Sequence, residues 1–131
     1  MKYILMMNTM KLGTNPFPGW SEADVKGHIG FMISLYKELS GAGELVAAEG
    51  LAFPEEAKLV RAGKNGEPVT DGVFPETKEF LAGYWLIDVP TPERAYQIAA
   101  KASSAPGLNG EAMNMPIEVR QVMAGPPPEF M

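Results

Sequence analysis

The sequence predicts an α+β domain in which two helices cover one face of a four-stranded sheet. Two observations lead to this fold class. Segments typical of strands and helices follow one another in the order strand, helix, strand, hairpin, strand, helix, strand. In addition, the first and third main strands are apolar on both faces, whereas the second and fourth carry charges, which predicts two central and two edge strands.

The first half of the chain contains two of the main strands and one helix. Residues 3–7 form a continuous apolar run, which is typical of a short strand buried on both faces. Ser21 and Asp24 form a capping pair, which predicts a helix over residues 21–40. The predicted buried positions of this helix recur at spacings of three and four, at Val25, Ile29, Met32, Tyr36 and Leu39. Residues 44–49 are then predicted as a strand.

The second half begins with a hairpin, because Asn65-Gly66 is a strong turn signal between two short strand-like runs. Residues 83–89 are dense in aromatic and β-branched side chains and are predicted as the third main strand. Thr91 and Pro92 start a second helix, and residues 117–123 supply the fourth strand. Without the hairpin, this is the split βαβ order of ferredoxin-like folds.

Composition fits one domain over residues 1–131, with a proline-rich C-terminal tail at 124–131. The absence of cysteine removes disulfides, thiolate nucleophiles and cysteine-based zinc sites. A net charge of -5 with scattered basic residues argues against nucleic-acid partners. No apolar run approaches the roughly 18 residues of a membrane span. The first apolar run is also too short for a signal peptide, so we expect a cytoplasmic protein with no membrane contact.

His28 is the only histidine and the main candidate for proton transfer. At 100° per residue it lies about 60° from Val25, at the margin of the predicted buried face. An imidazole at such a margin can reach both a cavity and water, and it titrates near neutrality. A half-buried histidine without a chemical task fits the same position, so the residues alone leave both interpretations open.

Three segments resemble one protein family. Residues 71–79 read Asp-Gly-Val-Phe-Pro-Glu-Thr-Lys-Glu, and residues 83–89 read Gly-Tyr-Trp-Leu-Ile-Asp-Val. They are similar to the Asp-Gly-Pro-Phe segment and the following strand of the DGPF-domain proteins in the YCII-related family. Val73 stands where that motif has proline. Residues 43–51, Gly-Glu-Leu-Val-Ala-Ala-Glu-Gly-Leu, extend the resemblance over most of the chain.

The resemblance implies a homodimer built as a dimeric α+β barrel. The sequence favours it too, because two helices cover only one face of such a sheet. One implied function is a lyase or isomerase with a histidine–aspartate pair and a small aromatic or anionic substrate, since related proteins include a dehydrochlorinase acting on a chlorinated hydroquinone. The alternative is a non-catalytic small-molecule-binding or regulatory module, of the kind that accompanies extracytoplasmic-function sigma factors.

The resemblance also implies that His28 pairs with an acidic residue. Asp71 is the predicted partner, since a carboxylate facing an imidazole fixes its tautomer and stabilises the cation. Asp71 also fits a turn in which its carboxylate bonds its own backbone. Glu49 is the other candidate acid and a predicted ligand-binding residue, and Thr77 and Lys78 are predicted to bind an anionic group. With one histidine and no cysteine, we expect no metal and no cofactor.

Overall fold

The computed structural model describes residues 1–9, 17–72, 80–127 and 129. These residues form two α-helices, six strands and short 3₁₀ turns at Pro54–Glu56 and Leu108–Gly110. The helices and strands are, in order, β1 (Lys2–Thr9), α1 (Glu22–Gly41), β2 (Leu45–Gly50), β3 (Lys58–Ala62), β4 (Pro68–Gly72), β5 (Phe80–Asp88), α2 (Pro92–Ser103) and β6 (Ile117–Gln121). This order confirms the predicted one. Within the described ranges, no helix combines the length and apolarity needed to cross a bilayer.

Four strands form one antiparallel sheet in the order β2–β5–β1–β6. The two strands that are apolar on both faces are therefore central, and the two charged strands are at the edges, as predicted. In the middle of the sheet, Leu5 of β1 lies opposite Trp85 of β5 on one side and Val119 of β6 on the other. With both helices, this arrangement is an α+β ferredoxin-like fold.

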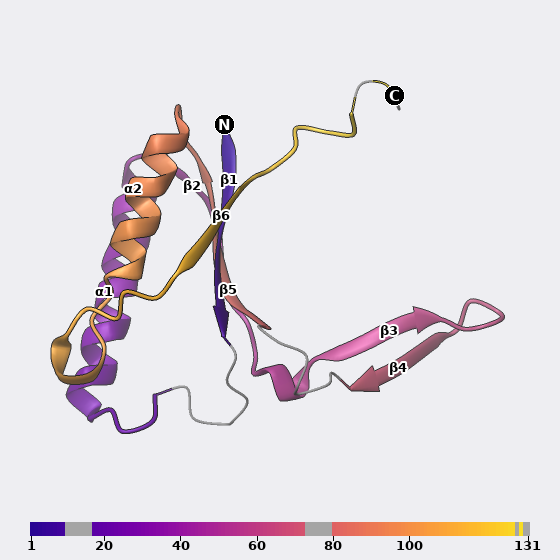
Figure 1. The fold of residues 1–131 in the computed structure, drawn as a ribbon, viewed down its shortest axis with the longest axis horizontal. Coiled ribbons are helices and arrows are strands. Elements are labelled where there is room, and N and C mark those ends of the chain that lie inside the picture. Colours follow the sequence, from indigo (N-terminus) through magenta and orange to yellow (C-terminus); the bar gives the residue numbers. More distant parts are fainter. Residues whose placement is uncertain (10–16, 73–79, 128, 130–131) are drawn as a thin grey trace.

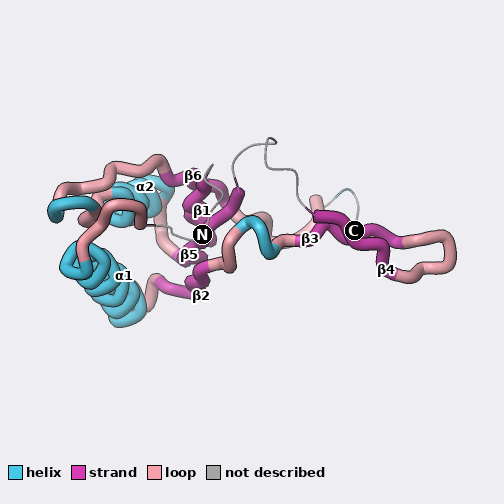
Figure 2. The backbone as a smooth tube through the Cα atoms, turned by 90° about the horizontal axis from the view of Figure 1, so that it is seen from below, coloured by secondary structure: helices cyan, strands magenta, loops and turns pink. Residues whose placement is uncertain are grey.

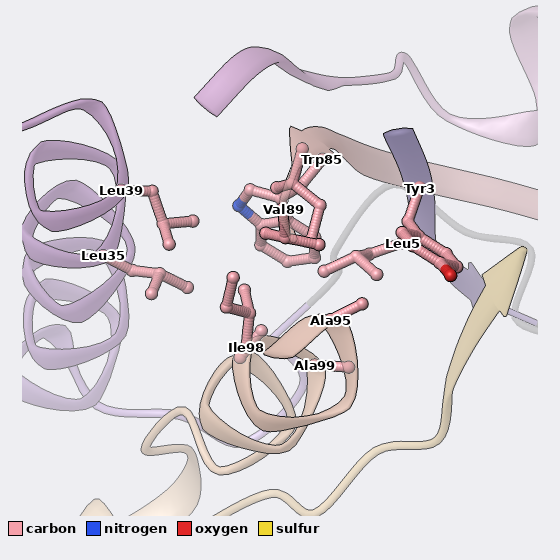
Figure 3. Packing of buried hydrophobic residues seen from close by; sticks show 11 residues of the cluster. Tyr3, Leu5, Leu35, Leu39, Trp85, Val89, Ala95, Ile98 and Ala99 are labelled. Atoms are coloured by element: carbon pink, nitrogen blue, oxygen red, sulfur yellow. The ribbon is translucent and has the colours of Figure 1, made fainter. Parts of the chain in front are cut away.

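Both helices lie on the same face of the sheet (Figure 1). Side chains alternate along each strand, so Leu5 and Ile87 point to the helices and are fully buried. Figure 3 shows the core where the sheet meets the helices, with contributions from Leu35, Leu39, Trp85 and Ile98. The opposite face, which we call the open face, carries the partly exposed side chains of Ile4, Met6, Tyr84 and Leu86 at its centre.

Helix α1 buries a side that overlaps only in part with the one predicted. Ile29 and Tyr36 were expected in the core, but they are about half exposed, at 46% and 50%. Leu39 is 1% exposed, as predicted, and Leu35, which was not among the predicted positions, is also 1% exposed and faces the sheet. The helix carries two apolar stripes with helical spacing, and only packing on the sheet selects between them. His28 is seven residues before Leu35, two turns away, so it lies in line with the buried stripe rather than at its margin.

Strands β3 and β4 form a separate two-stranded sheet. The turn between them includes Gly66 with a φ of 83°, as the Asn65-Gly66 pair predicted. Figures 1 and 2 show this hairpin projecting away from the main sheet, on the side of the open face. Every residue of β3 is exposed, and so is every residue of β4 except Val69. We call residues 58–72 the arm.

Candidate functional site

A capping box fixes the start of α1. The backbone N–H of Asp24 donates to Oγ of Ser21 at 3.1 Å, and the backbone N–H of Ser21 donates to the Asp24 carboxylate at 3.0 Å. The second bond stabilises the charged carboxylate and lowers the pKa of Asp24. Because the helix begins at this defined point, its geometry also fixes the position of His28 one to two turns later.

The imidazole of His28 is oriented by a backbone carbonyl. Its Nδ1 lies 3.0 Å from the carbonyl oxygen of Pro106, in the segment that follows α2. A carbonyl oxygen only accepts hydrogen bonds, so Nδ1 must carry the proton and donate it. The neutral ring then has its lone pair on Nε2. No described residue forms a hydrogen bond with Nε2, so this nitrogen remains able to exchange a proton.

Two aromatic rings that precede α1 pack against His28. The ring centroids of Phe17 and Trp20 lie 5.8 and 5.5 Å from that of the imidazole. Gly107 allows this packing, because a Cβ there would lie 3.1 Å from Cζ2 of Trp20 and 2.7 Å from Cγ of Met113. Neither aromatic residue was among the predicted site residues. Two aromatic residues just before a capped helix were the signal for this contact.

A pocket of about 270 Å³ lies beside His28, between α1 and the β2–β5 edge of the sheet. His28, Met32 and Tyr36 border it from α1, and Trp85 borders it from β5. Apart from the imidazole, these are apolar and aromatic groups of the kind that line small-molecule sites. Met32 and Tyr36 were predicted as core positions; Met32 does pack against the core, and both residues form one wall of this pocket.

Two glycines form part of the floor of the pocket. Gly50 of β2 and Gly83 of β5 lie opposite each other in the sheet and both border the pocket. A Cβ on Gly83 would lie 3.0 Å from the carbonyl oxygen of Glu49 and 3.5 Å from Cα of Gly50. No side chain enters the pocket from Gly83, whose missing Cβ also lets the two strands approach closely.

Glu49 is the acidic residue that borders the same pocket. Its neighbour Ala48 pairs with the buried Trp85, so alternation along β2 directs the Glu49 side chain toward the open face. Both His28 and Glu49 are described by the structure, and no hydrogen bond joins them. The fold therefore brings the two predicted site residues to one pocket without making them partners.

Asp71 lies on the arm, where it pairs with Leu59 across β3 and β4. The arm extends on the open-face side of the sheet, whereas α1 and His28 lie on the other side (Figure 1). One chain by itself therefore does not bring Asp71 beside His28, and their pairing stays a prediction. Thr77 and Lys78 lie outside the described residues.

The other pockets are weaker candidates for a functional site. One of about 960 Å³ lies between the N-terminus and the C-terminal tail, where the amino group of Met1 pairs with Asp88 at 3.0 Å. Another of about 330 Å³ lies at the base of the arm and is bordered by Phe53 and Phe80. In the part of the chain that the structure describes, no three His, Cys, Asp or Glu side chains gather to hold a metal ion. The His28 pocket is the candidate site because it joins a titratable group to apolar walls.

Comparison with known proteins identifies the family of the chain. No curated protein matches the chain. The YCII-related domain matches residues 1–113, a range that includes the arm, both helices and every strand of the main sheet except β6. The match also contains His28, its carbonyl partner and the pocket. The chain therefore belongs to the YCII-related family.

Proposed function

We propose that this protein is a small enzyme of lyase or isomerase type, in which His28 transfers a proton. The supporting observation is the hydrogen bond from Nδ1 of His28 to the carbonyl of Pro106, which leaves Nε2 as the base. Nε2 takes a proton from the substrate, and the resulting imidazolium returns it at another substrate atom or transfers it to a leaving group. One nitrogen can thus act first as general base and then as general acid.

The proposed substrate is a small aromatic or anionic compound. The pocket of about 270 Å³ is slightly smaller than the roughly 300–1,000 Å³ typical of ligand sites, so a compact molecule fits best. Met32 and Trp85 provide apolar and aromatic contact surface for a ring. Once Nε2 has taken a proton, the imidazolium favours negative charge beside it, which suits a carboxylate or an enolate.

We propose that an acidic side chain acts together with His28. Asp71 is the proposed acidic partner of His28, and Glu49 at the rim of the pocket is the alternative. Nδ1 of His28 already donates to Pro106, so a carboxylate would act on the Nε2 side of the ring, where the substrate binds. Thr77 and Lys78 are proposed to hold the anionic group of the substrate.

We also propose that the chain works as a homodimer through the open face. Ile4, Met6, Tyr84 and Leu86 form an apolar centre there that the two helices cannot cover. The edge strand β6 adds two charges of opposite sign to this face, Glu118 and Arg120. A two-fold axis places the same patch of each copy against the other, so opposite charges two residues apart can pair across it.

Deuterium exchange tests the proton transfer without knowledge of the natural substrate. The protein is incubated in D₂O with small compounds that carry an exchangeable C–H, namely levulinate, phenylpyruvate and chlorohydroquinone, and loss of substrate C–H signals beyond the uncatalysed rate is followed by ¹H NMR. We expect the wild type to catalyse exchange into at least one compound. His28→Asn keeps an N–H donor in the place of Nδ1 but has no counterpart of Nε2, so we expect it to lose about 100-fold or more in rate.

The same samples separate enzyme from binding module. Ligand binding is followed by the changes in amide chemical shift around the pocket of ¹⁵N-labelled protein. His28→Asn should show the same changes, because its side-chain N–H can still donate to the carbonyl of Pro106 and preserve the shape of the pocket. Exchange by His28→Asn at the wild-type rate would exclude Nε2 as the base. Binding without exchange of any compound would favour the non-catalytic ligand-binding or regulatory module.

A further inference from the structure

The arm exposes apolar side chains that its own chain does not cover. Leu59 and Val60, which point to opposite faces of the hairpin, are 53% and 61% exposed. The arm has only two strands, and an isolated two-stranded hairpin is marginally stable in water. Additional contacts that cover these side chains would therefore stabilise it. The described residues of the chain do not supply them.

The charge of the arm is complementary to that of the rest of the chain. Residues 58–72 contain three basic and two acidic side chains, a net charge of +1. The remaining residues contain eight basic and fourteen acidic side chains, a net charge of -6. A second copy of the chain therefore offers the arm a body of net negative charge, with a favourable electrostatic contribution to docking.

The arm also has the direction and the length to reach a second copy. It leaves the body on the open-face side, away from both helices (Figures 1 and 2). Its strands pair over five residues, which at about 3.3 Å per residue span about 17 Å. Two sheets packed face to face lie only about 10 Å apart. An arm of this length extends beyond the sheet of a copy that covers the open face.

We propose that the arm packs against the body of a second copy of this chain and anchors the homodimer. This contact covers one face of the arm, and with it either Leu59 or Val60, and the basic residues of the arm lie against the negatively charged body of the other copy. Asp71 travels with the arm, so it lies on the other subunit instead of beside His28 of its own chain. The contact is a reciprocal exchange of arms, because a two-fold axis makes both subunits give and receive one.

The absence of cysteine makes a spin-label experiment selective. Asn65→Cys, in the exposed turn of the arm, carries a nitroxide on unlabelled protein. This protein is mixed with ¹⁵N-labelled wild type, which has no attachment site, and subunits are allowed to exchange. Broadening in the ¹⁵N spectrum then reports only contacts between copies. Lys26→Cys is the matched control, because Lys26 lies on α1 with a side chain 75% exposed.

We expect the arm label to reduce body amide signals of the other copy by at least about half, relative to the reduced nitroxide. The Lys26 label should cause no such loss. Signal loss confined to residues 58–72 would overturn the proposal, because the arms would then pair with each other rather than with the body. A signal loss no greater than in the Lys26 control would overturn the proposal as well, and a stable monomer would give that result. No ligand or turnover enters the measurement, so its failure leaves the role proposed for His28 intact.

Discussion

His28 receives its tautomer from a carbonyl 78 residues away in the chain. A carboxylate partner would stabilise the imidazolium, whereas a carbonyl fixes the ring and directs the basic lone pair to Nε2 without supplying a charge. The predicted partners of His28 were acidic side chains, Asp71 and Glu49. Backbone oxygens have no signature in the sequence, so the fold was needed to identify Pro106.

At the same scale, a substitution of Gly83 tests whether β2 and β5 approach each other closely at the floor of the pocket. We expect Gly83→Ala to lower the free energy of unfolding by about 1–2 kcal/mol, because the new methyl must push away the backbone of Glu49, 3.0 Å distant. Urea denaturation followed by tryptophan fluorescence measures the change.

Gly30→Ala is the control for that substitution. Gly30 lies within α1, where a Cβ would meet nothing within 4 Å. Alanine there should raise the free energy of unfolding by about 0.5–1 kcal/mol, because it restricts the unfolded chain and suits a helix. If Gly83→Ala were also stabilising, the strand spacing around Glu49 would be wrong.

At the scale of elements, an ion pair joins the start of β2 to the start of α2. Arg94 donates to both carboxylate oxygens of Glu44, from Nε and from the guanidinium Nη2, each at 2.8 Å. The Glu44 side chain is only 14% exposed. This hydrogen bonding to Arg94 lowers the pKa of Glu44 below its usual value of 4.5. The pair therefore holds helix and strand together most effectively when Glu44 is ionised.

The pH dependence of stability follows from the lowered pKa. A carboxyl group whose pKa is lower in the folded protein stabilises it fully above the unfolded value near 4.5, and the contribution disappears as pH falls through the folded value. At pH 7 we expect Glu44→Gln to cost about 1 kcal/mol of unfolding free energy. The difference from wild type should shrink below pH 4.5 in urea titrations at each pH.

The pair between Glu22 and Lys26 provides the comparison for Glu44. Both side chains are mostly exposed, at 84% and 75%, so water screens their attraction. Glu22→Gln should change stability by less than about 0.5 kcal/mol at any pH. If Glu44→Gln lost the same unfolding free energy at every pH from 7 down to 3, the charge of Glu44 would not be what joins β2 to α2.

At the scale of the whole molecule, the proposed dimer through the open face predicts the oligomeric state. We expect light scattering at micromolar concentration to give twice the chain mass of 14.2 kDa. Leu86→Asp should produce monomers, because a two-fold axis brings both new carboxylates into the same apolar interface. Leu86 is only partly buried within one chain, so circular dichroism should show the variant still folded.

Ile33→Asp separates this effect from a general loss of solubility. Ile33 is 50% exposed on α1, away from the open face, so the variant should remain dimeric. A wild-type monomer, or a Leu86→Asp dimer as tight as wild type, would contradict assembly through the open face. Dissociation by Ile33→Asp instead would assign the interface to the exposed stripe of α1.

Local patterns in the sequence were sufficient to predict the elements and their order in the sheet. The apolar runs at 3–7 and 83–89 required burial on both sides, which only central positions provide. Likewise, the Ser21 cap, the Thr91 cap and the Asn65-Gly66 turn act through hydrogen bonds and backbone angles within a few residues. These caps, turns and apolar runs each involve only a few consecutive residues, so they can be recognised without knowledge of distant contacts.

The tertiary structure alone decided which side of α1 faces the core and what surrounds His28. Ile29 and Leu35 belong to stripes of equal helical spacing, and the sheet beneath the helix selected the second. The carbonyl of Pro106 reaches His28 only once both helices pack on the sheet. The sequence therefore determined the type of each element and its place in the sheet, because those depend on local spacing and polarity. The pocket depends on contacts between residues far apart in the chain, which exist only in the folded molecule.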